Sequence, residues 1–418
     1  MAIAPLVAGL AIAVPIPAQA EVRAPAVEPL AAPVGGVFWF EGRGAGHGRG
    51  MSQWGAEGAA SHGVGYRRIL STYYPGTRLV RTKADPPIRV LLSRVGSDLV
   101  QVAAVPGLQL TTGRRTATLP QAVGRAVVRG WRVRPSGRSL VLEDFTNRWR
   151  VHAVAGRLEL RAPEAVRVTV AGGSREYRGA LQVLPTERPG QLQVVNVVDV
   201  EDYLRSVVPS ESMAGWAPAA LAAQAVAART WAHWRAEHAP APAVSDVCDT
   251  AACQMYPGYR TLDAAGRVDQ VFEDPRTDRA VAATRGAELT WHGRPAFTEY
   301  SASDGGWTAA GGLPYLPARR DPWDGLAANP AHSWTDSVPA EVIRAWWPAV
   351  GRPLGLAAQR RDGTGPWGGR VLTVRIVGDR GQVLVPANQF AARTGLSATW
   401  WQLRGATGLP RPRTRHHG

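Results

Sequence analysis

The sequence is poor in lysine and lacks the short motifs of several enzyme classes. Lys83 is the only lysine among 48 basic residues, and the arginines are scattered rather than gathered into runs. Despite the net charge of +15, we therefore do not expect a nucleic-acid partner. Neither a Walker motif nor a Rossmann glycine spacing occurs, which argues against a nucleotide site. The absence of HExxH argues against a zinc hydrolase, and no solenoid repeat or coiled-coil heptad is present.

The start of the sequence predicts export. Residues 1–20 are apolar and uncharged and end in Ala18-Gln19-Ala20, a pattern typical of signal-peptide cleavage. The basic residues that usually open a signal peptide are missing, but three prolines interrupt the run and disfavour a stable membrane anchor. We expect a secreted protein with an Ala/Pro-rich linker over 21–35. The basic, Pro-containing tail over 405–418 is expected to be disordered.

The apolar pattern predicts an α+β fold. From 86 to 195, runs such as IRVLLSRV, SLVLEDF and VRVTVAG predict about eight short strands in a β-rich domain. From 218 to 237, an Ala-rich segment that begins with proline predicts a helix packed closely on several sides. It would be the centre of a mixed sheet-and-helix core over 196–404. Shorter helices are expected over 54–62, 66–74, 278–285, 339–347 and 387–394.

Glu211 stands just ahead of this Ala-rich helix and is the most informative acidic residue. It lies in a turn-prone segment between Ser210 and Ser212, close to apolar Met213 and Trp216. One interpretation is a helix-capping acid at the positive end of the helix dipole. The other is a general acid, whose pKa apolar neighbours would raise by desolvation. The residues alone leave both interpretations open.

The stretch VVPSES…W…ALAAQAVAARTWA closely resembles the signature of the sporulation stage II protein D family (SpoIID/LytB). Glu211 falls on the catalytic glutamate of that family. The resemblance implies a peptidoglycan lytic transglycosylase, which cleaves between N-acetylmuramic acid and N-acetylglucosamine without water and leaves a 1,6-anhydro product. Ser212-Met213 departs from the family's Met-Pro, and Ala219 and Ala222 replace a Glu and a Lys. The change at Ala219 removes a second candidate acid.

A second family signature, G-H-G-x-G-M-S-Q-x-G-A, matches residues 46–56. It implies that segment 36–80 packs with the catalytic core and carries His47 to the substrate, although a structural role for this histidine is equally open. In the family's familiar order this element follows a segment resembling 390–401, whereas here it precedes it. The order predicts a circular permutation, with residues 38–41 and 400–404 as neighbouring antiparallel strands.

The resemblance also implies a sugar-binding cleft built from polar residues of several segments. The substrate-binding residues that we expect are His47, Ser52, Gln53, Arg229, Gln254, Tyr256, Tyr300, Ser303, Gly305 and Gly306. Packing roles for Tyr256 and for the loop around Ser303 are the alternatives. Glu299 and Asp304 are candidate partners of Glu211, and the sequence does not rank them.

Cys248 and Cys253 are the only two cysteines. In an exported protein, a pair this close most simply forms a disulfide. The competing interpretation is zinc, with His233 and His238 as further ligands. Some family members bind zinc here through a His-Cys pair, but Ala252 precedes Cys253 in this sequence. We therefore expect the disulfide, with no metal and no cofactor.

The sequence thus predicts a secreted cell-wall enzyme that cuts peptidoglycan glycan strands with one glutamate. Glu211 would protonate the glycosidic oxygen, and its carboxylate would then take the proton of the C6 hydroxyl as that oxygen closes on C1. The resemblance implies a preference for strands stripped of their stem peptides. The alternative is a non-catalytic peptidoglycan-binding protein that stimulates an amidase partner, as the name "amidase enhancer" implies for some relatives.

Overall fold

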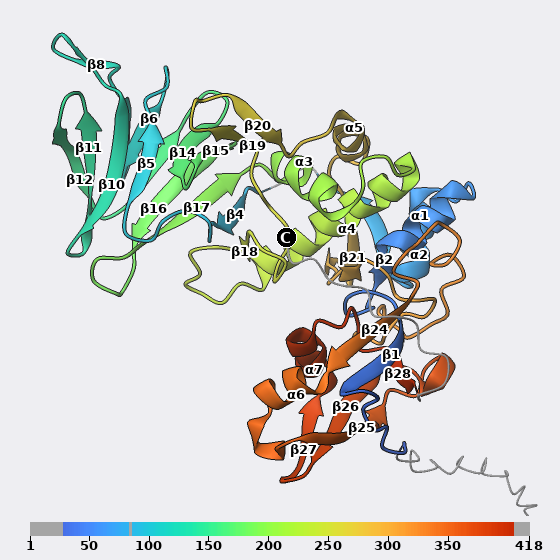
Figure 1. Ribbon diagram of the computed structural model, residues 1–418. Helices are drawn as coiled ribbons and strands as arrows, with labels where there is room; N and C mark the ends of the chain where they lie inside the picture. Colours follow the sequence, from blue (N-terminus) through green and yellow to red (C-terminus); the bar gives the residue numbers. More distant parts are fainter. Residues whose placement is uncertain (1–27, 83–85, 405–418) are drawn as a thin grey trace, which may run out of the picture.

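Three hydrophobic cores organise the computed structural model, which describes residues 28–82 and 86–404 (Figure 1). A β-rich lobe, a helical centre and a small lobe at the bottom of the picture are each built around buried side chains. The mixture of helices and mainly antiparallel sheets confirms the expected α+β class. Among the described residues, no helix is long and apolar enough to cross a membrane. The predicted signal peptide and tail lie outside the described residues.

The β-rich lobe consists of two sheets that share one core. Their strand orders are β12-β11-β10-β5-β14-β15-β19-β20 and β18-β4-β17-β16-β13-β6-β7. Trp131 of the first sheet and Leu158 and Leu181 of the second lie in the same buried cluster, so the two sheets exclude water together. The strands are β4 (Ile88–Leu91), β5 (Val100–Ala103), β6 (Gln109–Thr112), β7 (Arg115–Thr118), β10 (Gly130–Ser136), β11 (Ser139–Phe145), β12 (Trp149–Ala155), β13 (Leu158–Arg161), β14 (Val166–Val170), β15 (Gly173–Tyr177), β16 (Ala180–Pro185), β17 (Leu192–Val198), β18 (Val247–Cys248), β19 (Arg260–Asp263) and β20 (Val268–Val271).

This lobe contains more strands than the sequence predicts. Fourteen strands lie between Ile88 and Val198, where about eight were expected. Every residue of β7 and of the ribbon formed by β8 (Ala122–Val123) and β9 (Ala126–Val127) is exposed. Strands that bury neither face carry no apolar alternation, so the pattern on which the prediction rests is missing there.

The helical centre is built around α4 (Pro218–Glu237), which has the predicted bounds. Its residues 220–233 are all buried. Ala225 and Ala228 belong to the core shared with the β-rich lobe, whereas Ala223 and Ala227 belong to the core that includes α1 and α2. Small side chains let neighbours approach the helix from several directions, as expected for an alanine-rich segment. Around it lie α1 (Gln53–Ser61), α2 (Tyr66–Tyr73), α3 (Val200–Glu211), α5 (Pro275–Ala283), β2 (Met51–Ser52), β3 (Arg78–Arg81), β21 (Ala287–Trp291), β22 (Arg294–Pro295) and β23 (Tyr300–Ser301).

A buried ion pair joins α4 to α3. The Arg229 guanidinium is 0% exposed and donates to both carboxylate oxygens of Glu201 at 3.0 and 2.8 Å. Arg229 also donates to the carbonyl of Ala287 at 3.1 Å. This arrangement corrects the expectation that Arg229 binds substrate, because a side chain enclosed on every side cannot reach a ligand. Its role is to satisfy a buried carboxylate and to connect two helices and a strand.

The small lobe has two three-stranded sheets and two α-helices that contact each other. In the first sheet, β1 (Val37–Arg43) lies between β24 and β28. The pairing of β1 with β28 is antiparallel and places Phe40 opposite Leu403, which confirms the predicted pairing of these distant segments. Phe40 also contacts the ring of Trp401 edge to face. The other elements are β24 (Ser333–Pro339), α6 (Ala340–Trp346), η1 (Pro348–Val350), β25 (Pro353–Arg361), η2 (Pro366–Gly368), β26 (Val371–Gly378), β27 (Gly381–Pro386), α7 (Ala387–Thr394) and β28 (Trp401–Arg404).

The Arg229–Glu201 pair makes a testable contribution to stability. Arg229→Met is expected to lower the free energy of unfolding by about 3–5 kcal/mol, because it leaves the buried Glu201 carboxylate without its cation. Denaturant unfolding followed by circular dichroism measures the loss. Arg276→Met, which removes an exposed arginine paired with Asp274, is the matched control and should change stability little. A loss below about 1 kcal/mol for Arg229→Met would show that the pair is not needed.

Candidate active site

A cavity of about 540 Å³ opens beside the C-terminal end of α3. It collects four of the residues that the sequence predicts for the site: His47, Gln53, Glu211 and Tyr300. They come from the Gly-rich segment, α1, α3 and β23, which are far apart in the chain. The remaining lining residues are Ala45, Gly46, Arg49, Trp231, Arg235, Ala251, Ala252, Cys253, Met255, Phe297, Glu299, Ser301 and Ala302.

Glu211 is the last residue of α3, and this corrects the sequence interpretation. The segment before it was expected to be a turn leading to the N-terminus of α4. Instead, Ser212 is the C-cap, so Glu211 lies at the negative end of the α3 dipole. A helix-capping role at a positive end is therefore excluded. The dipole of α3 disfavours a charged carboxylate, which is the opposite of the effect that the capping interpretation implied.

The environment of Glu211 favours its protonated form. Burial raises the pKa of the Glu211 carboxyl above its ordinary value. The Met255 amide donates to Oε1 of Glu211 at 2.7 Å and lowers the pKa in part, as does the Gln53 side chain. Gln53 also donates to the main-chain carbonyl of Glu211 at 2.8 Å and holds the end of α3 in place. Met213, which was expected to supply the desolvation, is instead 53% exposed.

Across the cavity, Arg49 and Glu299 form a fork of two hydrogen bonds. Nε and Nη2 of Arg49 donate to the Glu299 carboxylate at 2.8 and 2.5 Å. Glu299 therefore lies in the cavity of Glu211 but is held as an ion pair. The other candidate partner, Asp304, is fully buried and does not line this cavity.

His47 contributes a neutral ring to the cavity. Its Nδ1 accepts a hydrogen bond from the main-chain N–H of Arg49 at 3.0 Å. Although the residue is partly open to solvent, desolvation of its ring lowers the pKa of His47 to about 4, and the charge of Arg49 contributes to the shift. Because Nδ1 accepts, the neutral imidazole carries its proton on Nε2, which can donate a hydrogen bond without adding charge to the cavity.

Several residues predicted to bind substrate belong instead to the framework behind the cavity. Ser52 and Ser303 are fully buried, and both donate to the carboxylate of Asp324. Ser52 also caps α1 by accepting from the N–H of Gly55. Their position corrects the expected contact with sugar, because neither hydroxyl reaches the cavity. They connect the Gly-rich segment to the loop after β23.

Gln254 and Tyr256 are also enclosed. Gln254 is 1% exposed, accepts from Tyr203 at 2.8 Å and donates to the hydroxyl of Tyr300 at 2.9 Å. The Tyr256 hydroxyl donates to Asn196 at 2.6 Å. These contacts correct the predicted substrate-binding roles. Gln254 instead fixes the orientation of Tyr300, which does line the cavity.

Gly305 and Gly306 lie away from Glu211. They line a different cavity of about 380 Å³, together with Trp307, Arg320 and Trp400. Gly305 has a φ of 75°, and an added Cβ would lie 2.7 Å from the backbone nitrogen of Gly44. Gly305 therefore serves a close backbone crossing. The position of both glycines corrects their assignment to the cavity of Glu211.

The cysteine pair forms a disulfide, with the two Cα atoms 5.5 Å apart. Nδ1 of His233 is 2.8 Å from the Glu288 carboxylate, and His238 stacks on Trp234. The four side chains of the zinc alternative therefore do not form one ligand set. Cys253 lines the cavity, so the disulfide shapes the loop that carries Met255.

Three buried aspartates, Asp304, Asp321 and Asp324, form the one acidic cluster of metal-binding dimensions that the described residues contain. Asp324 already accepts hydrogen bonds from serine hydroxyls and from His332. Burial raises the pKa of Asp304 and of Asp321, and the two carboxyls bond to each other. The raised pKa of both carboxyls favours a proton shared between them, which would offset part of the negative charge.

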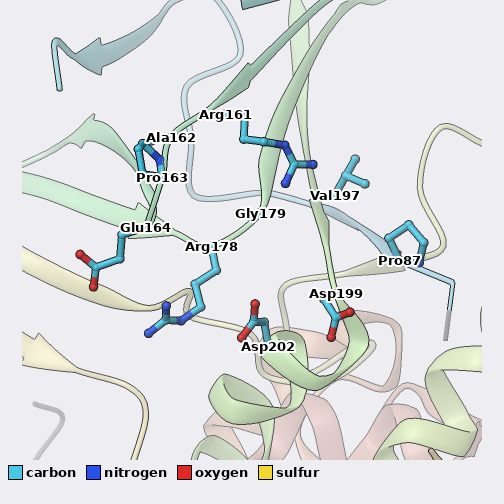
Figure 2. Close-up of a pocket in the computed structure, with 10 residues that line it drawn as sticks. All are labelled: Pro87, Arg161, Ala162, Pro163, Glu164, Arg178, Gly179, Val197, Asp199 and Asp202. Atoms are coloured by element: carbon cyan, nitrogen blue, oxygen red, sulfur yellow. The ribbon is translucent and has the colours of Figure 1, made fainter. Parts of the chain in front are cut away.

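Another cavity, of about 520 Å³, lies where the β-rich lobe meets α3 (Figure 2). Arg178 and Asp202 reach into it from opposite sides. Arg178 is held by two hydrogen bonds to Glu273 and lies over the ring of Tyr259. Asp199 caps α3 by accepting from the N–H of Glu201. These charges are used in joining the two lobes.

Sequence reasoning missed Trp231, Arg235, Met255 and Phe297 as lining residues of the Glu211 cavity. Trp231 and Arg235 are four residues apart on α4, and the guanidinium lies 5.7 Å from the centre of the indole ring. Residues four apart lie on one face of a helix, so the sequence could have indicated that these two side chains reach the same region. Met255 and Phe297 reach the cavity through loop positions that no periodicity marks.

Comparison with known proteins places this site in a described family domain. Residues 188–291 match the SpoIID family model, described as "Stage II sporulation protein". This match contains Glu211 and α4 and confirms the resemblance noted from the sequence. His47, Gln53 and Tyr300 lie outside the matched residues.

Three curated relatives resemble the chain over part of its length. It is 34% identical over 138 residues to the "Amidase enhancer" of Bacillus subtilis (strain 168), covering 32% of this chain and 16% of that protein. It is 30% identical over 163 residues to "Stage II sporulation protein D" of the same organism, covering 36% and 47%. The protein of that name from Bacillus amyloliquefaciens is 31% identical over 183 residues, covering 40% and 52%. The matches thus span about half or less of each relative.

The raised pKa of Glu211 predicts a pH-dependent difference in stability. The folded state prefers the neutral carboxyl, so the wild type loses stability as pH rises above the unfolded-state pKa. Glu211→Gln, neutral at every pH, should gain stability relative to the wild type between about pH 4 and pH 7. Thermal unfolding at both pH values measures this, with exposed Glu187→Gln as the control. If Glu211→Gln instead loses stability relative to the wild type between about pH 4 and pH 7, the environment assigned to Glu211 is wrong.

Proposed function

We propose that the protein is a secreted cell-wall enzyme that cleaves peptidoglycan glycan strands as a lytic transglycosylase. The observation that carries the proposal is the Glu211 carboxyl, whose pKa is raised and which lines a cavity of about 540 Å³. A carboxyl that stays protonated closer to neutral pH can donate its proton to a leaving oxygen. The similarity to stage II sporulation proteins supports peptidoglycan as the substrate.

The chemistry needs one acid that later acts as a base. Glu211 protonates the glycosidic oxygen as the bond to C1 of the muramic acid breaks. The Glu211 carboxylate then removes the proton of the C6 hydroxyl, whose oxygen bonds to C1 and closes the anhydro ring. Water is not consumed, so the second carboxylate of ordinary glycosidases is not required. The ion pair of Glu299 with Arg49 agrees with this division, since two hydrogen bonds from the guanidinium already engage the Glu299 carboxylate.

The second candidate is a non-catalytic protein that binds peptidoglycan and stimulates an amidase partner. The name of one relative, "Amidase enhancer", favours it. In that case the cavity would bind glycan without cleaving it. The two candidates differ in whether anhydro ends appear when purified protein is mixed with glycan.

We also propose that the fold is a circular permutation of the family's familiar arrangement. The pairing of β1 with β28 supports it, because these strands would be the two arms of one hairpin in the other order. His47 and Gln53, which follow β1, then reach the cavity of Glu211 without a change in its architecture.

Replacing the acid tests the proposed chemistry. Glu211→Gln should reduce anhydro-product formation by about 10²- to 10⁴-fold, because the amide keeps the shape but cannot give up a proton to the leaving oxygen. Mass spectrometry of digested, peptide-free glycan measures the products. Glu187→Gln, a change in an exposed turn, should retain full activity. Anhydro products at near wild-type yield from Glu211→Gln would assign the reaction to another residue.

The rate should also depend on pH, and it should fall as the pH rises. Catalysis starts from protonated Glu211, so kcat/KM is expected to fall as pH rises through the raised pKa of this group. His47, whose pKa is about 4, should not contribute a transition near neutral pH. A pH–rate profile of His47→Asn should therefore keep the position of the alkaline limb. A shift of that limb in this variant would show that His47 is the titrating group.

A further inference from the structure

A second hollow adjoins the cavity of Glu211 on the other side of Met255. It has a volume of about 530 Å³, and Met255 lines both. Ser210 belongs to this second hollow, and the next residue, Glu211, belongs to the first. The two hollows thus meet at the end of α3, where the Met255 amide donates to the Glu211 carboxyl. An extended polymer crossing Glu211 would occupy both.

The β-rich lobe supplies one wall of the second hollow. Arg94, from the loop between β4 and β5, and Arg175, from β15, both line it. Phe272, which follows β20, lies beneath the Arg175 guanidinium at 5.1 Å from the ring centre. The β-rich lobe, whose loop between β18 and β19 lines the Glu211 cavity, therefore also places two cations beside it.

The carboxylates in the second hollow already have partners. Glu273 pairs with Arg178 at 2.6 Å and with Arg205 at 2.8 Å, and Asp274 pairs with Arg276 at 2.7 Å. Asp249, which is close to the two arginines, is buried and accepts from the main-chain N–H and the hydroxyl of Ser93. These carboxylates therefore have hydrogen-bond partners other than Arg94 and Arg175, although the nearby charge of Asp249 acts to raise the pKa of Arg175.

The two arginines, in contrast, form no ion pair among the described residues. One nitrogen of Arg175 donates to the carbonyl of Pro257, a neutral partner. Burial lowers the pKa of Arg175, and the nearby charge of Arg94 lowers it further, so the two cations repel each other across the hollow. A carboxylate would stabilise such a pair of guanidinium groups, because each guanidinium can bind a carboxylate through two parallel hydrogen bonds.

We propose that Arg94 and Arg175 form a carboxylate-binding subsite that recognises the muramic acid unit of the glycan strand. The inference rests on the proposed function, because it assumes that a glycan crosses Glu211. Muramic acid carries a lactyl group, which ends in a free carboxylate when no peptide is attached. A stem peptide blocks that carboxylate but brings others. Both sources present the same group to the arginines, and neutral sugars present none.

Binding measured without catalysis tests the subsite. In the full-length Glu211→Gln protein, calorimetry compares short peptide-free glycan with the same glycan whose lactyl carboxylates are converted to amides, and with glycan that retains its stem peptides. We expect at least one carboxylate-bearing glycan to bind roughly tenfold more tightly than the amide form, as charge-assisted hydrogen bonds at a half-exposed site would give. The tighter of the two identifies the lactyl or the peptide carboxylate as the ligand.

Removing both guanidinium groups should abolish this preference. Arg94→Gln/Arg175→Gln, made in the Glu211→Gln background, is expected to bind all three glycans with similar affinity. Arg114→Gln/Arg267→Gln removes the same charge from exposed turns and should keep the preference. If the first pair does not fold, Arg175→Lys, which keeps the charge but loses the fork, should reduce the preference. Equal binding of all glycans by the parent protein, or a preference that survives Arg94→Gln/Arg175→Gln, would overturn the proposal.

This design separates the subsite from the reaction. Because Glu211→Gln has no acid to donate, its binding preference does not depend on whether the wild type forms anhydro products. A carboxylate preference without any cleavage by the wild type would support the subsite and exclude the transglycosylase. Cleavage without a carboxylate preference would overturn the subsite alone.

Discussion

The structure depends on the burial of α4 on every side. From Ala220 to His233 the helix has no exposed residue, and its alanines belong to two different hydrophobic cores. Such a helix can be surrounded only if its side chains are small, and the one long charged side chain within it must be neutralised. Arg229 meets that condition through Glu201 of α3. The same ion pair fixes α3, and thereby the position of Glu211 at its end.

The sequence predicted the parts of the fold that have a distinctive composition or a recognisable order of motifs. The helix over 218–237 and the pairing of β1 with β28 were predicted correctly because they rest on composition and on the order of family motifs. Helix α3 was missed because Pro209, Ser210 and Ser212 indicate a turn. The structure accommodates Pro209 inside the helix, and the Ser210 hydroxyl donates to the Ser206 carbonyl at 2.7 Å. In this segment, tertiary packing outweighs the local preference for a turn. It also places Glu211 at the negative end of a helix, whereas the capping interpretation assumed a positive end.

The family-like motifs mark the framework of the site more than its surface. Ser52 of the Gly-rich signature and Ser303 of the later loop were predicted to meet sugar, yet both donate to Asp324 behind the cavity. A match to a motif indicates that a side chain is needed, but not whether it is needed for structure or for binding. A buried hydroxyl that joins two loops can be as necessary as one that contacts a ligand. Sequence alone does not distinguish these roles, because the partner Asp324 lies 272 residues from Ser52 along the chain.

Two sets of interactions act on the charge of Glu211 in opposite directions, and the set that disfavours the charge is the stronger one. Burial and the carboxyl end of α3 disfavour its charge, whereas the Met255 amide and the Gln53 side chain favour it. The favourable contacts also orient the carboxyl toward the cavity, so they cannot be removed without losing its position. The pKa of Glu211 therefore rises overall because the carboxyl is held in a fixed orientation while it is partly desolvated. Because desolvation raises the pKa of Glu211, we expect a ligand that displaces water from the cavity to raise this pKa further as it binds.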